Sequence, residues 1–140
     1  MNTIAACTIA LGCFLGAGTS QACSCLKEEF FLKEDGWAVE VLAAKTDIVH
    51  ARVVEVLADG NARIEAINAL KGAGKVSILI RGTTYPTCDI RFKVGEEFVY
   101  LLDSSTTVHL CDRLKPTPAI LHSLEEMLTK KPPADEARKR

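Results

Sequence analysis

The sequence Cys23-Ser24-Cys25 constrains this chain more than any other feature, because it places two cysteines directly after an apolar leader. Residues 1–22 carry no Lys, Arg, Asp or Glu, and they end in Ser20-Gln21-Ala22, which has the small residues that a leader peptidase requires. The apolar run is shorter than the ~20 residues that span a bilayer. We predict a signal peptide over 1–22, cleaved after Ala22, and a mature chain that begins with the amine of Cys23.

Export to an oxidising compartment would lead the cysteines of the mature chain to form disulfides. Cys7 and Cys13 leave with the leader, and an even number remains in an oxidising environment, which predicts two disulfides. A bond between Cys23 and Cys25 would close a ring around one residue, which disulfide geometry excludes. Both remaining pairings tie the N-terminus to two distant points, and each long loop stabilises by roughly 4 kcal/mol. The mature cysteines are Cys23, Cys25, Cys88 and Cys111.

The pattern of apolar residues predicts a mainly β domain over 23–131 and a charged, disordered tail over 132–140. The alternation slips by one at Val53-Val54 and at Ala66-Ile67, which indicates a β-bulge or a sharp bend in each of two strands. Small barrels use such bends to close. The five predicted strands cover Ile48–Leu57, Ala62–Leu70, Lys75–Arg81, Phe98–Leu102 and Thr106–Cys111.

Helical patterns flank these strands. Residues 27–45 turn helical after a charged start, with Trp37 as a core anchor. Thr117 is placed to cap a second helix with Pro118 at its first position. We expect a five-stranded OB-fold Greek-key barrel with flanking N- and C-terminal helices and two disulfides, and a β-sandwich is the alternative. The apolar face of the second helix comprises Ile120, Leu121, Leu124, Met127 and Leu128.

Charge and composition exclude several functions. The leader carries no formal charge, so the mature chain keeps the net charge of −1, which is a poor match for nucleic acid. His50, His109 and His122 are scattered and have no metal-ligand spacing. The sequence has no Ser/His/Asp arrangement and no glycine-rich phosphate loop, and oxidised cysteines are not nucleophiles. We therefore expect a protein that is not an enzyme and has no intrinsic cofactor.

An ordered set of motifs resembles a known family, the N-terminal domain of the tissue inhibitors of metalloproteinases within the wider group of netrin-like modules. The resemblance covers roughly residues 23–116, and it rests on the order and spacing of short matches rather than on any one of them. These are Cys23-Ser24-Cys25, Thr46-Asp47-Ile48-Val49, Leu70-Lys71-Gly72, Cys88 after a loop, Gly95-Glu96-Glu97-Phe98, His109-Leu110-Cys111-Asp112 and Pro116.

The resemblance implies an OB barrel with the disulfides Cys23–Cys88 and Cys25–Cys111. In the family, the amine and carbonyl of the first residue chelate the catalytic zinc of the protease, the second residue enters its specificity pocket, and the loop before the partner cysteine touches the enzyme. Carried over, these roles belong to Cys23, to Ser24, and to Pro86 and Thr87. The zinc belongs to the target enzyme and not to this chain.

We therefore expect a monomeric protein, secreted or periplasmic, whose partner is a zinc metalloproteinase or another extracellular protein. One alternative is an interaction module that does not inhibit proteases. Another is a lipoprotein anchored to the membrane at Cys23, in which acylation would consume both the amine and the sulfur of that residue.

Overall fold

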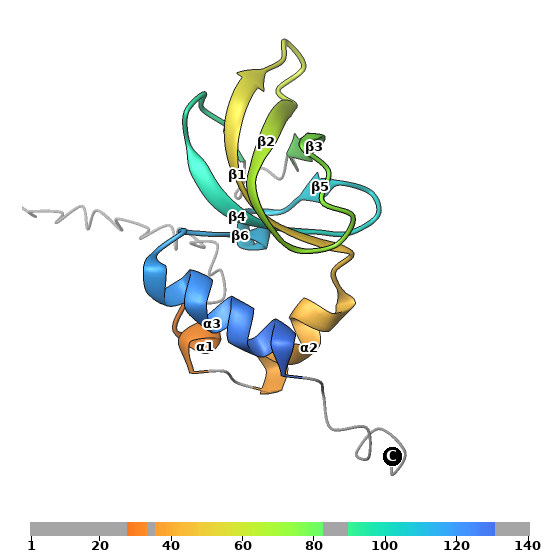
Figure 1. The fold of residues 1–140 in the computed structure, drawn as a ribbon. Coiled ribbons are helices and arrows are strands. Elements are labelled where there is room, and N and C mark those ends of the chain that lie inside the picture. The colour runs from red at the N-terminus through yellow and green to blue at the C-terminus, as the bar shows by residue number, and fades with distance from the viewer. Residues whose placement is uncertain (1–27, 34–35, 83–89, 131–140) are drawn as a thin grey trace, which may run out of the picture.

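The computed structural model describes residues 28–33, 36–82 and 90–130. Within these residues the chain is mainly β, with helices packed together on one side of a twisted sheet (Figure 1). In chain order the elements are α1 (Glu28–Leu32), α2 (Gly36–Ala44), β1 (Asp47–Val56), β2 (Ala62–Lys71), β3 (Ser77–Gly82), β4 (Glu97–Leu102), β5 (Thr107–Val108), the 3-10 turn η1 (Leu110–Asp112), β6 (Arg113–Leu114) and α3 (Pro118–Thr129).

Strand β4 lies at the centre of the molecule, because Val99 to Leu102 are buried on both faces of the sheet. Successive side chains of a strand point to opposite faces. Tyr100 and Leu102 therefore join the cluster on the inner face of the sheet, while Val99 and Leu101 join the cluster beneath the helices. The strand thus connects two apolar layers, one inside the barrel and one between the sheet and the helices.

Two bulges bend the first hairpin where the sequence predicted them. The register between β1 and β2 shifts so that Val54 has no partner on β2, and Ile67 has none on β1. A bulge increases local twist and turns the strand. The predicted slips at Val53-Val54 and Ala66-Ile67 are confirmed, and the register shifts again at Leu70.

The sheet is a nearly closed barrel of six strands in the order β5-β3-β2-β1-β4-β6 (Figure 1). β5 runs parallel to β3, and β6 runs antiparallel to β4. These short strands form the two edges of the described sheet, and only residues 109–112 separate them along the chain. The two edges are therefore held close together.

The expected single strand over Thr106–Cys111 was wrong, and the described sheet has six strands where five were expected. Asp112 interrupts the strand by accepting a hydrogen bond from the backbone N–H of His109 at 3.0 Å. The backbone N–H of Asp112 in turn donates to the carbonyl of His109 at 2.9 Å. This pair of bonds closes η1, so that the segment forms two short strands on either side of a 3-10 turn.

The helices form a layer against the outer face of β1 and β4. α3 begins as predicted: the Thr117 hydroxyl accepts from the Ile120 N–H, Pro118 is in the first turn, and Ile120, Leu124 and Met127 are buried. The helical region near the N-terminus forms two helices, α1 and α2. The expectation that Trp37 anchors the core was wrong, since this side chain is 39% exposed and packs edge-on against Phe30.

Candidate functional site

The residues predicted to contact a protease lie outside the described residues. This holds for Cys23, Ser24, Pro86 and Thr87, and for the cysteines Cys25 and Cys88. Cys111 is the only cysteine within the described ranges, and it is disulfide-bonded. The described residues that flank the predicted site are Glu28 on one side, and Gly82 and Ile90 on the other.

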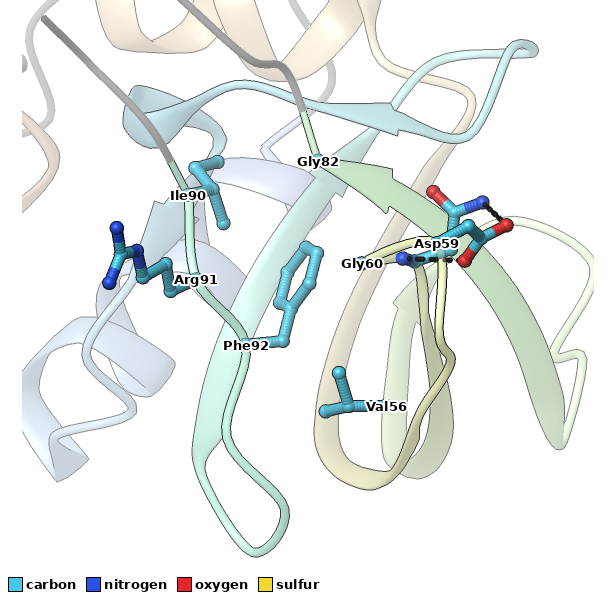
Figure 2. A pocket seen from close by; sticks show the side chains of 8 residues that line it. Val56, Asp59, Gly60, Gly82, Ile90, Arg91 and Phe92 are labelled. Carbon is cyan, nitrogen blue, oxygen red and sulfur yellow. Dashed lines mark hydrogen bonds between the residues drawn. The ribbon is translucent and has the colours of Figure 1, made fainter.

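A pocket of about 360 Å³ lies beside the turn between β1 and β2. This turn is at the end of the barrel away from the helices (Figure 1). Its apolar wall consists of Val56, Ile90 and Phe92, and the Phe92 ring points toward Gly82 at the end of β3 (Figure 2). Phe92 is only 7% exposed, so it packs mainly into the barrel interior. The ring therefore lines the pocket with one part of its surface, while most of it stays buried in the apolar core.

Gly82 allows Phe92 to pack this closely against the end of β3. A Cβ atom on Gly82 would lie 3.2 Å from Cε2 of Phe92 and 3.4 Å from the carbonyl oxygen of Ile90. The contact with the Phe92 ring is tighter than ordinary van der Waals distance, so a larger residue would require the ring to shift by a few tenths of an ångström or more. A glycine at the end of a strand often marks such a close approach.

The opposite wall is polar and consists of residues of the turn between β1 and β2, which hydrogen-bond to one another. The Asp59 carboxylate accepts from the backbone N–H of Asn61 at 3.0 Å and from its side-chain amide at 2.8 Å, as the dashed lines in Figure 2 show. Such bonds from Asp to the backbone two residues on are typical of tight turns. Arg91 also lines the pocket, but its guanidinium extends away from Phe92 (Figure 2).

A second pocket, of about 290 Å³, lies between the helices and the barrel next to Cys111. It is mostly apolar, and its polar lining includes an ion pair in which Lys45 Nζ donates to Asp112 Oδ1 at 2.7 Å. Both partners of this pair are largely shielded from solvent. The remaining lining residues are Phe31, Trp37, Val41, Ala44 and Leu101.

Two of the motifs that carried the family resemblance meet at the junction of β1, β2 and α2. The Asp47 carboxylate accepts from the Ala73 N–H at 3.2 Å, next to Gly72. Lys71 Nζ donates to the carbonyls of Leu42 and Ala43 at 2.8 and 3.0 Å. Lysine near a helix C-terminus satisfies its last carbonyls and interacts well with the helix dipole. These residues hold the hairpin against α2.

The Gly95-Glu96-Glu97-Phe98 motif also has structural contacts. Gly95 takes a positive φ of 90°, and its N–H donates to the carbonyl of Val53 at 2.8 Å. Glu97 accepts from Arg52 at 2.5 and 2.9 Å and lies 3.3 Å from the ring of His50. The Arg52 guanidinium lowers the pKa of Glu97, with a smaller contribution from His50. The acid is thus half of an ion pair rather than a free acid or base.

The barrel interior contains one strongly perturbed tyrosine. Tyr100 is fully buried, and this desolvation raises its pKa to about 12. The charge of Arg113 opposes this shift and the charge of Glu96 adds to it. Sequence patterns singled out neither Tyr100 nor Arg113, nor Phe92 in the pocket wall. A signal for Phe92 was present, because Ile90-Arg91-Phe92 alternates apolar and charged residues.

Within residues 28–33, 36–82 and 90–130, no group of three or more His, Cys, Asp or Glu side chains is placed to hold a metal ion. None of the helices described there is long and apolar enough to cross a membrane. Comparison of the chain with family models, with curated proteins and with solved structures finds no match.

Proposed function

We propose that the nearly closed barrel is an OB-fold of the netrin-like type. β5 and β6 count as one strand that η1 interrupts, so the order around the barrel becomes β1-β2-β3-β5/β6-β4 and back to β1. The pairing of β3 with β5 is the one parallel contact within the described sheet, and the other pairs are antiparallel. An OB barrel has this order and this single parallel pair.

We propose that the exported protein binds and inhibits a zinc metalloproteinase through its processed N-terminus. One contact carries the proposal: Glu28 Oε1 accepts from the backbone N–H of Lys115 at 3.1 Å. Glu28 lies three residues after Cys25, and Lys115 lies four residues after Cys111. Because each residue spans up to about 3.6 Å, the N-terminal cysteines are within reach of Cys111. The contact fits a disulfide from either N-terminal cysteine to Cys111, and the family resemblance selects Cys25–Cys111 with Cys23–Cys88 as the second disulfide.

The chemistry of inhibition then uses backbone atoms of Cys23. A catalytic zinc keeps an open position for water, and a neutral amine with a neighbouring carbonyl can fill it. An α-amine has a pKa of about 7.7–8.0, so a fraction of it is neutral at physiological pH. Two disulfides fix this chelate in advance and reduce the entropy lost on binding. Ser24 enters the specificity pocket, and Pro86 and Thr87 widen the contact.

An inhibition assay with two extended forms tests this proposal. The processed chain, a form with one Ala before Cys23 and a form with one Ala after Arg140 are titrated against a panel of zinc metalloproteinases. The N-terminal extension replaces the amine with an amide, so we expect at least a hundredfold loss of potency there and none for the C-terminal one. Equal potency of all three forms, or no inhibition by any of them, excludes chelation. Intact mass of the exported protein shows separately whether Cys23 is acylated.

A second candidate function is that of an interaction module that binds an extracellular protein without inhibiting proteases. The pocket beside Phe92 favours it, since a partly apolar concave site with one fixed polar wall is typical of recognition. If the protein is such a module, its affinity for the partner does not change when an Ala is added before Cys23. Binding is lost in Gly82→Val, because the valine side chain occupies the space beside Phe92.

A further inference from the structure

Two buried polar groups on neighbouring strands have no hydrogen-bond partner among the described residues. They are the hydroxyl of Tyr100 on β4 and the Nη1 of Arg113 on β6. Tyr100 and Arg113 are paired in register on antiparallel strands, so their side chains project from the same face of the sheet. Buried polar groups in folded proteins nearly always have a partner, and each exception calls for an explanation.

The two groups share one environment with Phe98. Cζ of Arg113 lies 4.6 Å from the centroid of the Phe98 ring, and that centroid lies 6.1 Å from the ring of Tyr100 in an edge-on arrangement. Phe98 precedes Tyr100 by two residues and therefore faces the same side. The aromatic face holds the guanidinium in place, which fixes the direction of its donors.

Both groups act as donors at neutral pH. A guanidinium has donors only and does not lose its proton in proteins. Burial keeps the phenol of Tyr100 protonated, with a pKa of about 12. Two acids of this region have other partners: Glu96, whose charge acts on Tyr100, accepts from the Lys93 N–H at 3.3 Å, and Asp112 pairs with Lys45. The missing partner is therefore an acceptor, and a negatively charged one also balances Arg113.

We propose that Tyr100 and Arg113 form a binding site for a carboxylate beside the edge strand β6. β6 has only two residues and Arg113 is half-buried, so a small anion reaches the guanidinium from the surface along this edge. One guanidinium matches one negative charge, and Glu96 nearby disfavours a dianion such as phosphate. The carboxylate belongs either to a free small acid or to the C-terminus of a peptide. This site is independent of the proposed protease inhibition.

The test is a titration of the full processed chain, observed through the ¹³Cζ resonance of Tyr100 and the Nε–H resonance of Arg113. Sodium acetate is the probe, and sodium chloride at the same ionic strength is the reference. Two further titrations use N-acetyl-glycylglycine, which ends in a carboxylate, and its amide, which does not. We expect a saturable shift with acetate and none with chloride or the amide. Tighter binding of the acetylated dipeptide identifies a peptide C-terminus as the ligand, and equal binding identifies a free acid.

Variants locate the response. Tyr100→Phe keeps the ring and removes the hydroxyl, and Arg113→Lys keeps the charge and removes the planar fork. We expect each to weaken acetate binding about tenfold, as expected for a lost charge-assisted hydrogen bond, while the exposed Arg81→Lys leaves it unchanged. A shift that is equal in all variants, or that chloride reproduces, overturns the proposal. If neither variant folds, the wild-type comparison of acetate, chloride and amide still decides it.

Discussion

The carboxylate of Asp47 occupies the space that a side chain on Gly72 would need. A Cβ built on Gly72 would clash with Oδ1 of Asp47 and would lie 2.9 Å from the carbonyl oxygen of Thr46. Gly72 also has a φ of 102°, in the region that favours glycine. The two residues belong to separate sequence motifs, which meet where β1 begins and β2 ends.

We predict that Gly72→Ala destabilises the fold by about 2–4 kcal/mol, because the positive φ costs ~1 kcal/mol or more and the Asp47 carboxylate must move. Urea denaturation measures the free energy of unfolding. Gly74→Ala is the matched control, since it has a positive φ of 63° but open space around its Cβ. We expect a smaller loss there, and equal losses in the two variants would contradict a role for the clash.

Ser123 fastens α3 to α1. Its hydroxyl is buried and donates to the carbonyl of Phe31, near the C-terminal end of α1, where helical carbonyls lack partners within the helix. Ser123→Ala leaves that carbonyl unsatisfied, and we expect a loss of about 1–3 kcal/mol in urea denaturation. Thr129→Ala removes an exposed bond to Glu126 and is expected to change stability by less than ~0.5 kcal/mol. The reverse ranking would show that α1 docks by apolar contact alone.

The ion pair of Arg52 and Glu97 makes stability depend on acid. The folded pKa of Glu97 lies below its ordinary value of 4.5, so the folded state binds fewer protons there than the unfolded state. Its contribution is complete above about pH 4.5 and is lost as the pH falls through the folded pKa. We predict that Glu97→Gln flattens this part of the profile of unfolding free energy against pH. Glu125→Gln, on the exposed face of α3, is the control variant, and identical profiles in the two variants would rule the ion pair out.

Trp37 and Leu42 lie on the same helix but differ in burial, at 39% and 2% exposed. Leu42→Ala empties a place in the core beneath the sheet, and we expect a cost of about 2–5 kcal/mol. Trp37→Ala removes a half-exposed ring that touches Phe30, for which we expect about 1 kcal/mol. Thermal or urea denaturation of the two variants shows which loses more stability. A loss for Trp37→Ala as large as that for Leu42→Ala would show that Trp37 is part of the core.

The features that sequence predicted are those set by neighbouring residues. The bulges at Val54 and Ile67 follow from a slip in alternation, and the start of α3 follows from Thr117 and Pro118. Both signals are local, so they could be interpreted without knowing the rest of the fold.

The features that sequence missed depend on distant contacts. Apolar periodicity cannot tell which of several apolar faces of a helix meets the sheet, so Trp37 was misplaced. The division of the last strand depends on a bond from Asp112 back to His109, which breaks an otherwise extended pattern. The pocket beside Phe92 and the pair Tyr100 and Arg113 each combine residues from separate segments, and no single stretch of sequence indicates them.

The bond between Ser123 and Phe31 joins residues 92 positions apart. The helix layer and the closure of the barrel both use segments near the C-terminal end of the described chain, whereas α1 and β1 are made first. A growing chain therefore lacks the partners for its earliest elements until synthesis is almost complete, and contacts of such long range form slowly. Folding of such a chain is therefore completed only after nearly the whole polypeptide has been made.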